Sequence, residues 1–254
     1  MENQVYLPTI TQDESRAEGA GPLALNAGIP WQHGVEFEGQ AIEALDLDEW
    51  YNWLPTGQTP MLWNLEQDSA VYKAAVEDGL RNSRTWLILN EPERSDQANY
   101  TAEQGKKRIS AWRFRTGYNC TWVGPNVQLN EKGFDWLTQY RYTWKGAIPD
   151  AWGVHIYEGQ PVDWQARLDK LYTWMRRFHC ERPVWITETC SAGIRFAEQV
   201  AILEKCAEVL RSGQVEKVFW YSARDWFPSY KAADLLRADG ALTALGIEFL
   251  RARG

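Results

Sequence analysis

The feature that most constrains the fold is a regular alternation of short apolar runs with longer amphipathic ones. Most of the short runs are apolar throughout, which is typical of strands in a parallel sheet that is buried on both faces. Eight of them are predicted as strands: 22–30, 49–55, 59–65, 85–92, 120–128, 151–159, 183–190 and 216–226. This pattern places the chain in the α/β class.

Apolar residues recur at helical spacing in the intervals, which predicts helices over 69–82, 102–115, 131–145, 162–179, 196–212 and 242–253. Repeated strand–helix alternation predicts a (β/α)8 TIM barrel. No linker interrupts it, so residues 21–254 are predicted to form a single domain. Residues 1–20 are polar and are predicted to be a poorly ordered leader.

The connection between the second and third predicted strands is too short for a complete barrel. Only Pro-Thr-Gly-Gln, residues 55–58, separates Leu54 from Thr59. A parallel crossover normally takes a dozen or more residues with a helix. The barrel is therefore predicted to be trimmed, with the helix between strands 2 and 3 missing.

Charge and composition exclude several classes of partner. The 254-residue chain has a formal net charge of −7, which argues against nucleic acid and against an anionic membrane surface. It has no apolar run of about 18 residues, so no transmembrane helix is predicted. Its four cysteines have neither CxxC nor zinc-site spacing, which favours four buried free thiols.

Polar and aromatic residues gather at the carboxyl ends of the predicted strands, where barrel enzymes place their chemistry. The chain has 15 tryptophans, and an aromatic face suits the apolar C–H face of a sugar ring. One such strand end carries little weight, but eight predict a polar cleft with aromatic walls. The candidates are Trp31, His33, Tyr51, Trp53, Trp63, Asn64, Asn90, Glu91, Asn126, His155, Tyr157, Glu188 and Trp220.

Two of these candidates are carboxylates, Glu91 on strand 4 and Glu188 on strand 7. A barrel would bring both to one mouth although they are distant in sequence. Glycoside hydrolysis needs such a pair, one to protonate the leaving oxygen and one to attack the anomeric carbon or activate water. Taken alone, each glutamate could instead be an ordinary carboxylate in a surface turn.

Five segments together carry a resemblance to a known family: WYNWLP, PMLWN, LILNEPE, GVHIYEG and RPVWITE. With ILNEP, HIY, WITET and FWYS, they resemble the clan of retaining glycosidases that carry their two glutamates on strands 4 and 7. Within that clan the chain resembles glycoside hydrolase family 128, small barrels that cleave β-1,3-glucans. GPNVQ on strand 5 and Ile156 depart from the expected pattern.

The resemblance implies a role for each candidate. Glu91 would be the acid/base and Glu188 the nucleophile, with Tyr157 holding Glu188 ionised. Asn90 would contact the sugar 2-hydroxyl, and Trp220 would form the floor of the site. The other candidates would line subsites or support them, and a core position is equally compatible with His155. Glu93 is expected to be a solvated or salt-bridged loop residue.

The expected function is therefore endo-acting, retaining hydrolysis of β-1,3-glucan, without a metal or another cofactor and as a monomer. Such a substrate lies outside the cell, so an extracellular or periplasmic enzyme is expected, although residues 1–20 are not a signal peptide. Loops 94–101 and 226–239 are expected to shape the cleft.

Three alternatives stay open. Another retaining glycanase acting on mannan, xylan or β-1,4-glucan would share both glutamates. A non-catalytic glucan-binding barrel would not need both. An aldolase or isomerase barrel would need a strand lysine or a phosphate loop, and the region of strands 7 and 8 has neither.

Overall fold

The computed structural model describes residues 23–66, 68–82, 84–142, 148–225 and 232–254. The predicted leader lies outside these residues, as do the end of predicted helix 131–145, the last residue of predicted strand 216–226 and part of loop 226–239. The strands are β1 (Leu25–Gly28), β2 (Trp50–Tyr51), β3 (Met61–Leu62), β4 (Thr85–Ile88), β5 (Thr121–Val123), β6 (Val127–Gln128), β7 (Trp152–Glu158), β8 (Val184–Ser191) and β9 (Lys217–Trp220).

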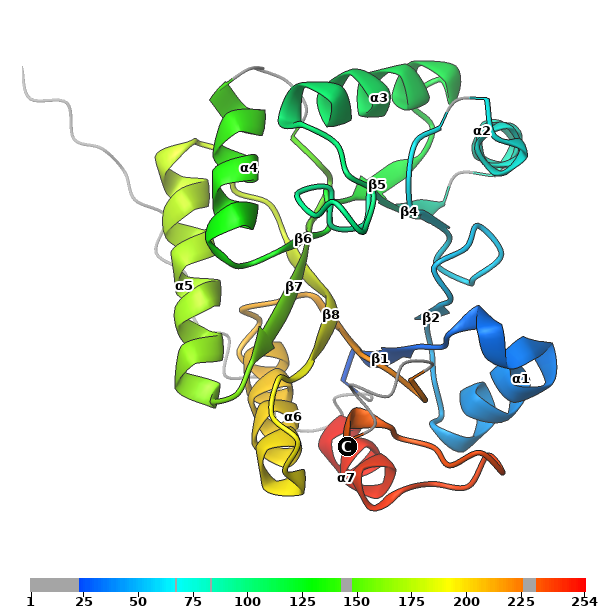
Figure 1. Ribbon diagram of the computed structural model, residues 1–254, viewed down its shortest axis with the longest axis vertical. Helices are drawn as coiled ribbons and strands as arrows, with labels where there is room; N and C mark the ends of the chain where they lie inside the picture. Colours follow the sequence, from blue (N-terminus) through cyan, green and yellow to red (C-terminus); the bar gives the residue numbers. More distant parts are fainter. Residues whose placement is uncertain (1–22, 67, 83, 143–147, 226–231) are drawn as a thin grey trace, which may run out of the picture.

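The helices lie outside the strands and surround them (Figure 1). They are η2 (Trp31–His33), α1 (Gly34–Ala44), α2 (Ala70–Arg81), α3 (Ala102–Arg115), α4 (Glu131–Tyr142), α5 (Pro161–Arg177), α6 (Phe196–Arg211) and α7 (Ala244–Arg253). Capping side chains mark where two of these helices begin: Ser69 caps the N-terminus of α2, and Thr101 forms a capping box with Gln104 at the N-terminus of α3. Of these helices, η2 and α1 do not appear among the sequence predictions.

All pairs of these strands are parallel, and they form two sheets. One has the order β2-β1-β9-β8-β7-β6 and the other β3-β4-β5. Isolated bridges from Asn90 to Asn126 and from Val123 to Ala151 link them on one side. On the other side Thr59 N donates to Trp50 O at 3.0 Å. This arrangement confirms the α/β class and the (β/α)8-type fold.

Two local features distinguish this barrel from the regular pattern. Residues 52–60, between β2 and β3, contain no helix, as predicted from the short connection. The fifth predicted strand is divided into β5 and β6 by Gly124 and Pro125, since Pro125 has no N–H to donate. Gly124 has a φ of 142°, and a Cβ there would lie 2.4 Å from Ile88 O, so only glycine fits.

The core has two layers. The inner layer, under the site, consists of Tyr51, Met61, Leu87, Val123, Ala151, Trp185 and Phe219. The outer layer fills the space between strands and helices and contains most of the buried rings, among them Trp86, Trp112, Trp122, Trp152, Trp164 and Trp220. All four cysteines are buried and free, as predicted.

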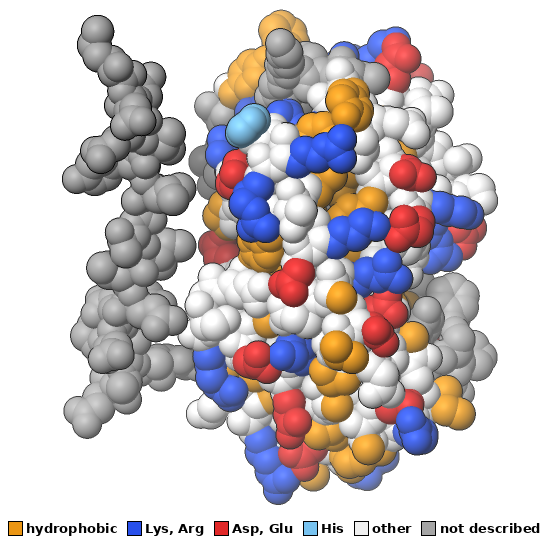
Figure 2. All heavy atoms as spheres, turned by 90° about the vertical axis from the view of Figure 1, so that its left-hand side faces the viewer, with side chains coloured by type: hydrophobic (Ala, Val, Ile, Leu, Met, Phe, Trp, Pro, Cys, Tyr) orange, Lys and Arg blue, Asp and Glu red, His pale blue; other side chains and the backbone are white. Residues whose placement is uncertain are grey.

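The surface bears on the partner predictions. On the face turned to the viewer in Figure 2, basic and acidic side chains are interspersed, and no broad basic patch covers it. Among the described helices, none combines the length and the apolar character needed to cross a membrane.

Candidate active site

Glu91 stands directly beyond β4, where the chain leaves the sheet. Leu89 and Glu91 both have positive φ values, 62° and 41°, which turn the backbone sharply. Glu91 N donates to Asn126 O at 2.7 Å, which fixes this turn to the strand pair alongside. The side chain of Glu91 is buried, with only 4% of its surface exposed.

Glu188 lies within β8 at an irregularity of the sheet. The pairing of β8 with β9 shifts register between Ile186 and Thr189, and a shift of this kind re-aims the side chains within it. Two donors bind its carboxylate: Tyr157 Oη donates to Oε2 at 2.6 Å, and Trp53 Nε1 donates to Oε1 at 2.7 Å. Tyr51 Oη also lies 3.3 Å from Oε1, but its shorter hydrogen bond goes to Thr187 O at 2.7 Å.

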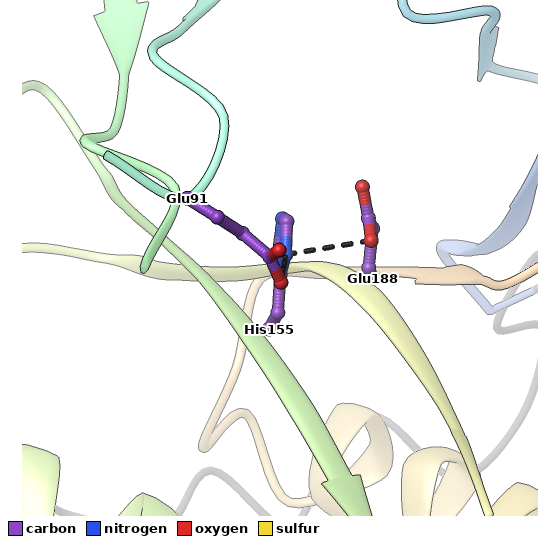
Figure 3. Close-up of side chains that lie close together, drawn as sticks. All are labelled: Glu91, His155 and Glu188. Atoms are coloured by element: carbon purple, nitrogen blue, oxygen red, sulfur yellow. Dashed lines mark hydrogen bonds and ion pairs between the residues drawn. The ribbon is translucent and has the colours of Figure 1, made fainter. Parts of the chain in front are cut away.

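His155 on β7 lies between the two carboxylates (Figure 3). Its Nδ1 atom is 3.0 Å from Glu91 Oε1 and 3.4 Å from Glu188 Oε2. One oxygen of each carboxylate and this ring nitrogen all lie within 4.8 Å of one another. The three side chains therefore form one compact buried cluster, brought together from three different strands or strand ends.

Burial and mutual charge determine the protonation of this cluster. Burial raises the pKa of Glu188 above its usual value, and the charge of Glu91 adds to this, while His155, Tyr157 and Trp53 oppose it. Burial alone would lower the pKa of His155, but the charges of Glu188, Glu91 and Glu93 outweigh burial and raise it. The cluster therefore favours a cationic imidazole that donates to carboxylate oxygens.

The cluster opens into a cleft with a volume of about 700 Å³. The walls combine flat aromatic rings with hydrogen-bonding groups, which is the composition expected for a sugar site. The lining residues are Pro30, Trp31, Gln32, Trp53, Leu54, Trp63, Asn90, Glu91, Arg94, Asp96, Gln97, Tyr157, Glu188, Tyr221 and Asp225.

Most of the residues chosen from the sequence lie in or directly beneath this cleft. Seven are in its lining: Trp31, Trp53, Trp63, Asn90, Glu91, Tyr157 and Glu188. Tyr51 and His155 are buried under it and contact the carboxylates. Asn90 Nδ2 donates to Gln97 Oε1 at 3.1 Å, while its buried Oδ1 has no partner within the described residues.

The other four candidates neither line the cleft nor contact the two carboxylates, and Trp220 is the main correction. Its ring is fully buried and its Nε1 donates to Ala233 O at 2.9 Å, so Tyr221 lines the cleft in its place. The side chain of Asn126 is also buried. Its amide donates to Ile88 O at 3.0 Å and accepts from Thr187 Oγ1 at 2.9 Å.

The remaining two have local partners. His33 Nε2 lies 3.0 Å from Arg224 O, and the ring packs against Phe37. Asn64 Oδ1 accepts from Glu66 N in a turn, at 3.5 Å. Both residues therefore support the structure around the cleft instead of lining it.

The sequence reading missed several residues in the loop after Glu91. Arg94 Nη1 lies 3.0 Å from Glu91 Oε2, and Gln97 binds Asn90. Glu93, expected to be a solvated or salt-bridged loop residue, is largely buried, and its Oε1 accepts from Gln128 N at 2.8 Å. Burial raises the pKa of Glu93 to about 7. All three follow the NEP motif, but their contacts form only when the loop folds back, and no local sequence pattern signals them.

Glu91, His155 and Glu188 also have atom types and spacing that a divalent cation could use. However, Tyr157 and Trp53 direct hydrogens at Glu188, and the Arg94 guanidinium lies against Glu91. Positively polarised donors already occupy the carboxylate oxygens. We therefore interpret the cluster as a hydrogen-bonded catalytic set.

Two neighbouring buried carboxyl groups at the strand ends of a (β/α)8-type barrel, in a cleft with aromatic walls, define a glycoside hydrolase site. The family comparison agrees with this class. Residues 35–249 match the family described as the glycosyl hydrolase catalytic core. The chain belongs to this family and is a glycoside hydrolase. Comparison with curated protein sequences finds no match.

Solved structures of glycoside hydrolase family 128 share the fold. A subgroup II endo-β-1,3-glucanase from Sorangium cellulosum is 23% identical with a TM-score of 0.69, over 90% of this chain and 98% of that one. A glutamate-to-alanine variant of a subgroup I endo-β-1,3-glucanase from Amycolatopsis mediterranei, in complex with laminaripentaose, is 20% identical with a TM-score of 0.69, over 91% and 99%.

A third similar structure is a subgroup III curdlan-specific exo-β-1,3-glucanase from Blastomyces gilchristii, in complex with glucose. It is 20% identical with a TM-score of 0.71, over 89% of this chain and 97% of that one. At these identities the likeness establishes the fold that the sequence resemblance implied.

Proposed function

We propose that the protein hydrolyses β-1,3-glucan with retention of configuration, with Glu91 as acid/base and Glu188 as nucleophile. The observation that carries the mechanism is the approach of the two carboxylates to within 4.8 Å between one oxygen of each. Retaining enzymes hold their carboxyl groups about 5–5.5 Å apart, whereas inverting enzymes leave about 6.5–9.5 Å for a water molecule.

In the first step Glu188 attacks the anomeric carbon while Glu91 gives its proton to the departing glycosidic oxygen. The glycosidic bond breaks and a glycosyl ester forms on Glu188. Tyr157 and Trp53 direct hydrogen bonds at Glu188, which stabilise its carboxylate and fix its orientation. Asn90 Oδ1, which is buried and otherwise unpaired in the described structure, accepts a hydrogen bond from the sugar 2-hydroxyl.

In the second step Glu91, now ionised, takes a proton from a water molecule. The water oxygen attacks the anomeric carbon, the ester bond to Glu188 breaks, and the sugar leaves with its original configuration. His155 bridges both carboxylates and holds them at a fixed separation through the two steps.

The β-1,3 linkage is supported by the similar structures, whose descriptions name β-1,3-glucanases of both endo and exo type. Trp31, Trp53, Trp63, Tyr157 and Tyr221 supply rings along the cleft on which successive glucose units stack. An endo mode of action, a monomeric state and an extracellular or periplasmic location stay predictions from the sequence.

Product analysis on soluble β-1,3-, mixed-linkage and β-1,4-glucans tests the proposal. Wild type is compared with Glu188→Gln and with Glu208→Gln, a matched change on the exposed side of α6. Oligosaccharides from β-1,3 substrates, lost only in Glu188→Gln, would support it. Products from mannan, xylan or β-1,4-glucan alone would overturn the linkage, and laminarin binding without cleavage would indicate a binding barrel. A rapid fall in viscosity with few new reducing ends would indicate endo action.

A further inference from the structure

The loop that follows Glu91 folds back on itself and carries a cation to the acid/base. Arg94 N donates to Glu91 O at 3.0 Å, and Ala98 N donates to Asn90 O at 3.1 Å. These bonds close a tight turn, so that Arg94, three residues beyond Glu91, returns to the cleft and becomes part of its lining.

Arg94 contacts two carboxylates at once. Its Nη1 lies 3.0 Å from Glu91 Oε2, while Nε and Nη2 bind Asp96 in a two-pronged contact at 3.0 and 2.7 Å. The Glu91 side chain is 4% exposed and that of Asp96 is 62% exposed. The guanidinium therefore connects the buried carboxylate of the site with an anion at the surface.

The two oxygens of Glu91 have different surroundings. Oε1 faces His155 inside the cluster, and Oε2 faces Arg94 in the cleft. An arginine keeps its charge and only donates hydrogen bonds. A protonated Oε2 could still accept from Nη1, but the contact is stronger when Glu91 carries its negative charge opposite the guanidinium. Asp96 binds the same guanidinium and so competes with Glu91 for its charge.

We propose that Arg94 is a positioning residue for the acid/base: it favours the ionised form of Glu91, and Asp96 limits this effect by competing for the guanidinium. The inference rests on the proposed role of Glu91. Arg94 then favours the ionised Glu91 that acts as the base in the second step. At high pH it works against the protonated Glu91 that acts as the acid in the first step.

Several other titratable groups face Glu91, and none of them is substituted in the Arg94 and Asp96 variants. They come from β2, from β7, from β8 and from the loop itself: Tyr51, His155, Tyr157, Glu188 and Glu93. Changing one charge of the Arg94–Asp96 pair therefore isolates the effect of that pair.

The test is the pH profile of kcat/KM on laminarin for wild type, Arg94→Gln, Arg94→Lys and Asp96→Asn. Without the cation, Glu91 keeps its proton to higher pH, so the ratio of kcat/KM at pH 8 to that at pH 6 should rise about threefold in Arg94→Gln. Asp96→Asn removes the competitor and should lower the same ratio. Arg94→Lys retains the charge and should stay close to wild type.

Arg251→Gln is the matched control, because Arg251 pairs with Glu248 at the same three-residue spacing on α7, away from the cleft. Profiles that change in height but not in shape for both Arg94→Gln and Asp96→Asn would overturn the proposal. A shift in the same direction for both variants would also overturn it.

A second measurement keeps this inference separate from the proposed function. The Glu91 carboxyl is titrated by ¹³C NMR in labelled protein, with its signal assigned from Glu91→Gln. Ionisation at higher pH in Arg94→Gln and at lower pH in Asp96→Asn supports the inference even if no glucan is cleaved. Unchanged titration overturns it even if wild type is active.

Discussion

At the scale of single residues, the site holds backbone conformations that side chains normally avoid. Trp53, Leu89 and Glu91 have φ values of 62°, 62° and 41°, in the left-handed region that favours glycine. Such conformations cost free energy and persist only where the surrounding contacts fix them. Here those contacts aim the Trp53 indole and the Glu91 carboxyl at the cluster around His155.

The hydrogen bond from Tyr157 to Glu188 gives the first prediction. Tyr157→Phe removes a 2.6 Å donor to the carboxylate without changing the shape of the ring. A hydrogen bond to a charged group contributes about 1.5–3 kcal/mol, so kcat should fall roughly 10- to 100-fold with a native circular dichroism spectrum. Tyr118→Phe, at an exposed ring, serves as the control. Unchanged kcat would exclude Tyr157 from the mechanism.

Glu93 gives a prediction for stability against pH. Its pKa is about 7 in the folded protein against 4.5 as the reference, so the folded state binds its proton more tightly. The resulting stabilisation is complete below pH 4.5 and is lost as the pH rises through about 7. Glu93→Gln lacks this loss, so its unfolding free energy relative to wild type should rise between pH 5 and 8, by roughly 3 kcal/mol at most.

Urea unfolding of both proteins at several pH values measures this difference. Glu204→Gln, on α6, has no comparable burial and should follow wild type throughout. A difference between Glu93→Gln and wild type that stays constant with pH would contradict the buried state of this carboxyl.

Residue types at strand ends allowed much of the site to be predicted from the sequence, but burial was harder to predict. Glu91, Glu188, Trp53 and Tyr157 follow or close apolar runs, and barrel geometry then brings them together. Glu93 also follows such a run, yet its contact with Gln128 forms only when the loop folds back. No local pattern reports a contact of that kind.

At the scale of elements, strand and helix positions follow from local patterning, and the misses have local causes. The helix α1 buries only Phe37 and Ala41 and contains Gly34 and Gly39. Its apolar face is therefore too narrow for the helical periodicity to be recognised in the sequence. The family resemblance predicts Trp220 as the floor of the cleft. Instead the ring packs into the outer core, and the next residue, Tyr221, faces the carboxylates.

The packing of β1 against Trp53, which follows β2, gives a prediction at the scale of elements. A Cβ at Gly28 would lie 2.6 Å from Cη2 of Trp53, so Gly28→Ala must displace the indole that binds Glu188. Activity should fall roughly 10- to 100-fold, and stability by about 1–3 kcal/mol.

Gly39→Ala is the matched control for this change, because a Cβ there meets nothing within 4 Å. It lies inside α1 and should raise the unfolding free energy by about 0.5–1 kcal/mol without changing activity. Equal kcat/KM for both variants would show that the exact position of Trp53 does not matter.

At the scale of the whole molecule, the two carboxylates come from different sheets. Glu91 follows β4 of the three-stranded sheet, and Glu188 lies in β8 of the six-stranded sheet. Asn126 joins the two, since its amide donates to Ile88 O and accepts from Thr187. The separation of the carboxylates, and with it the reaction course, is therefore a property of how the sheets are joined.

That separation makes the stereochemistry of hydrolysis the most direct test of the central claim. Proton NMR of laminarin hydrolysis, recorded in the first minutes, identifies the anomer released before mutarotation. Glu91 and Glu188 at their observed spacing predict that the β anomer appears first and that the α anomer follows only as the sugar equilibrates. If the α anomer appears first, hydrolysis inverts the configuration and Glu188 is not the nucleophile.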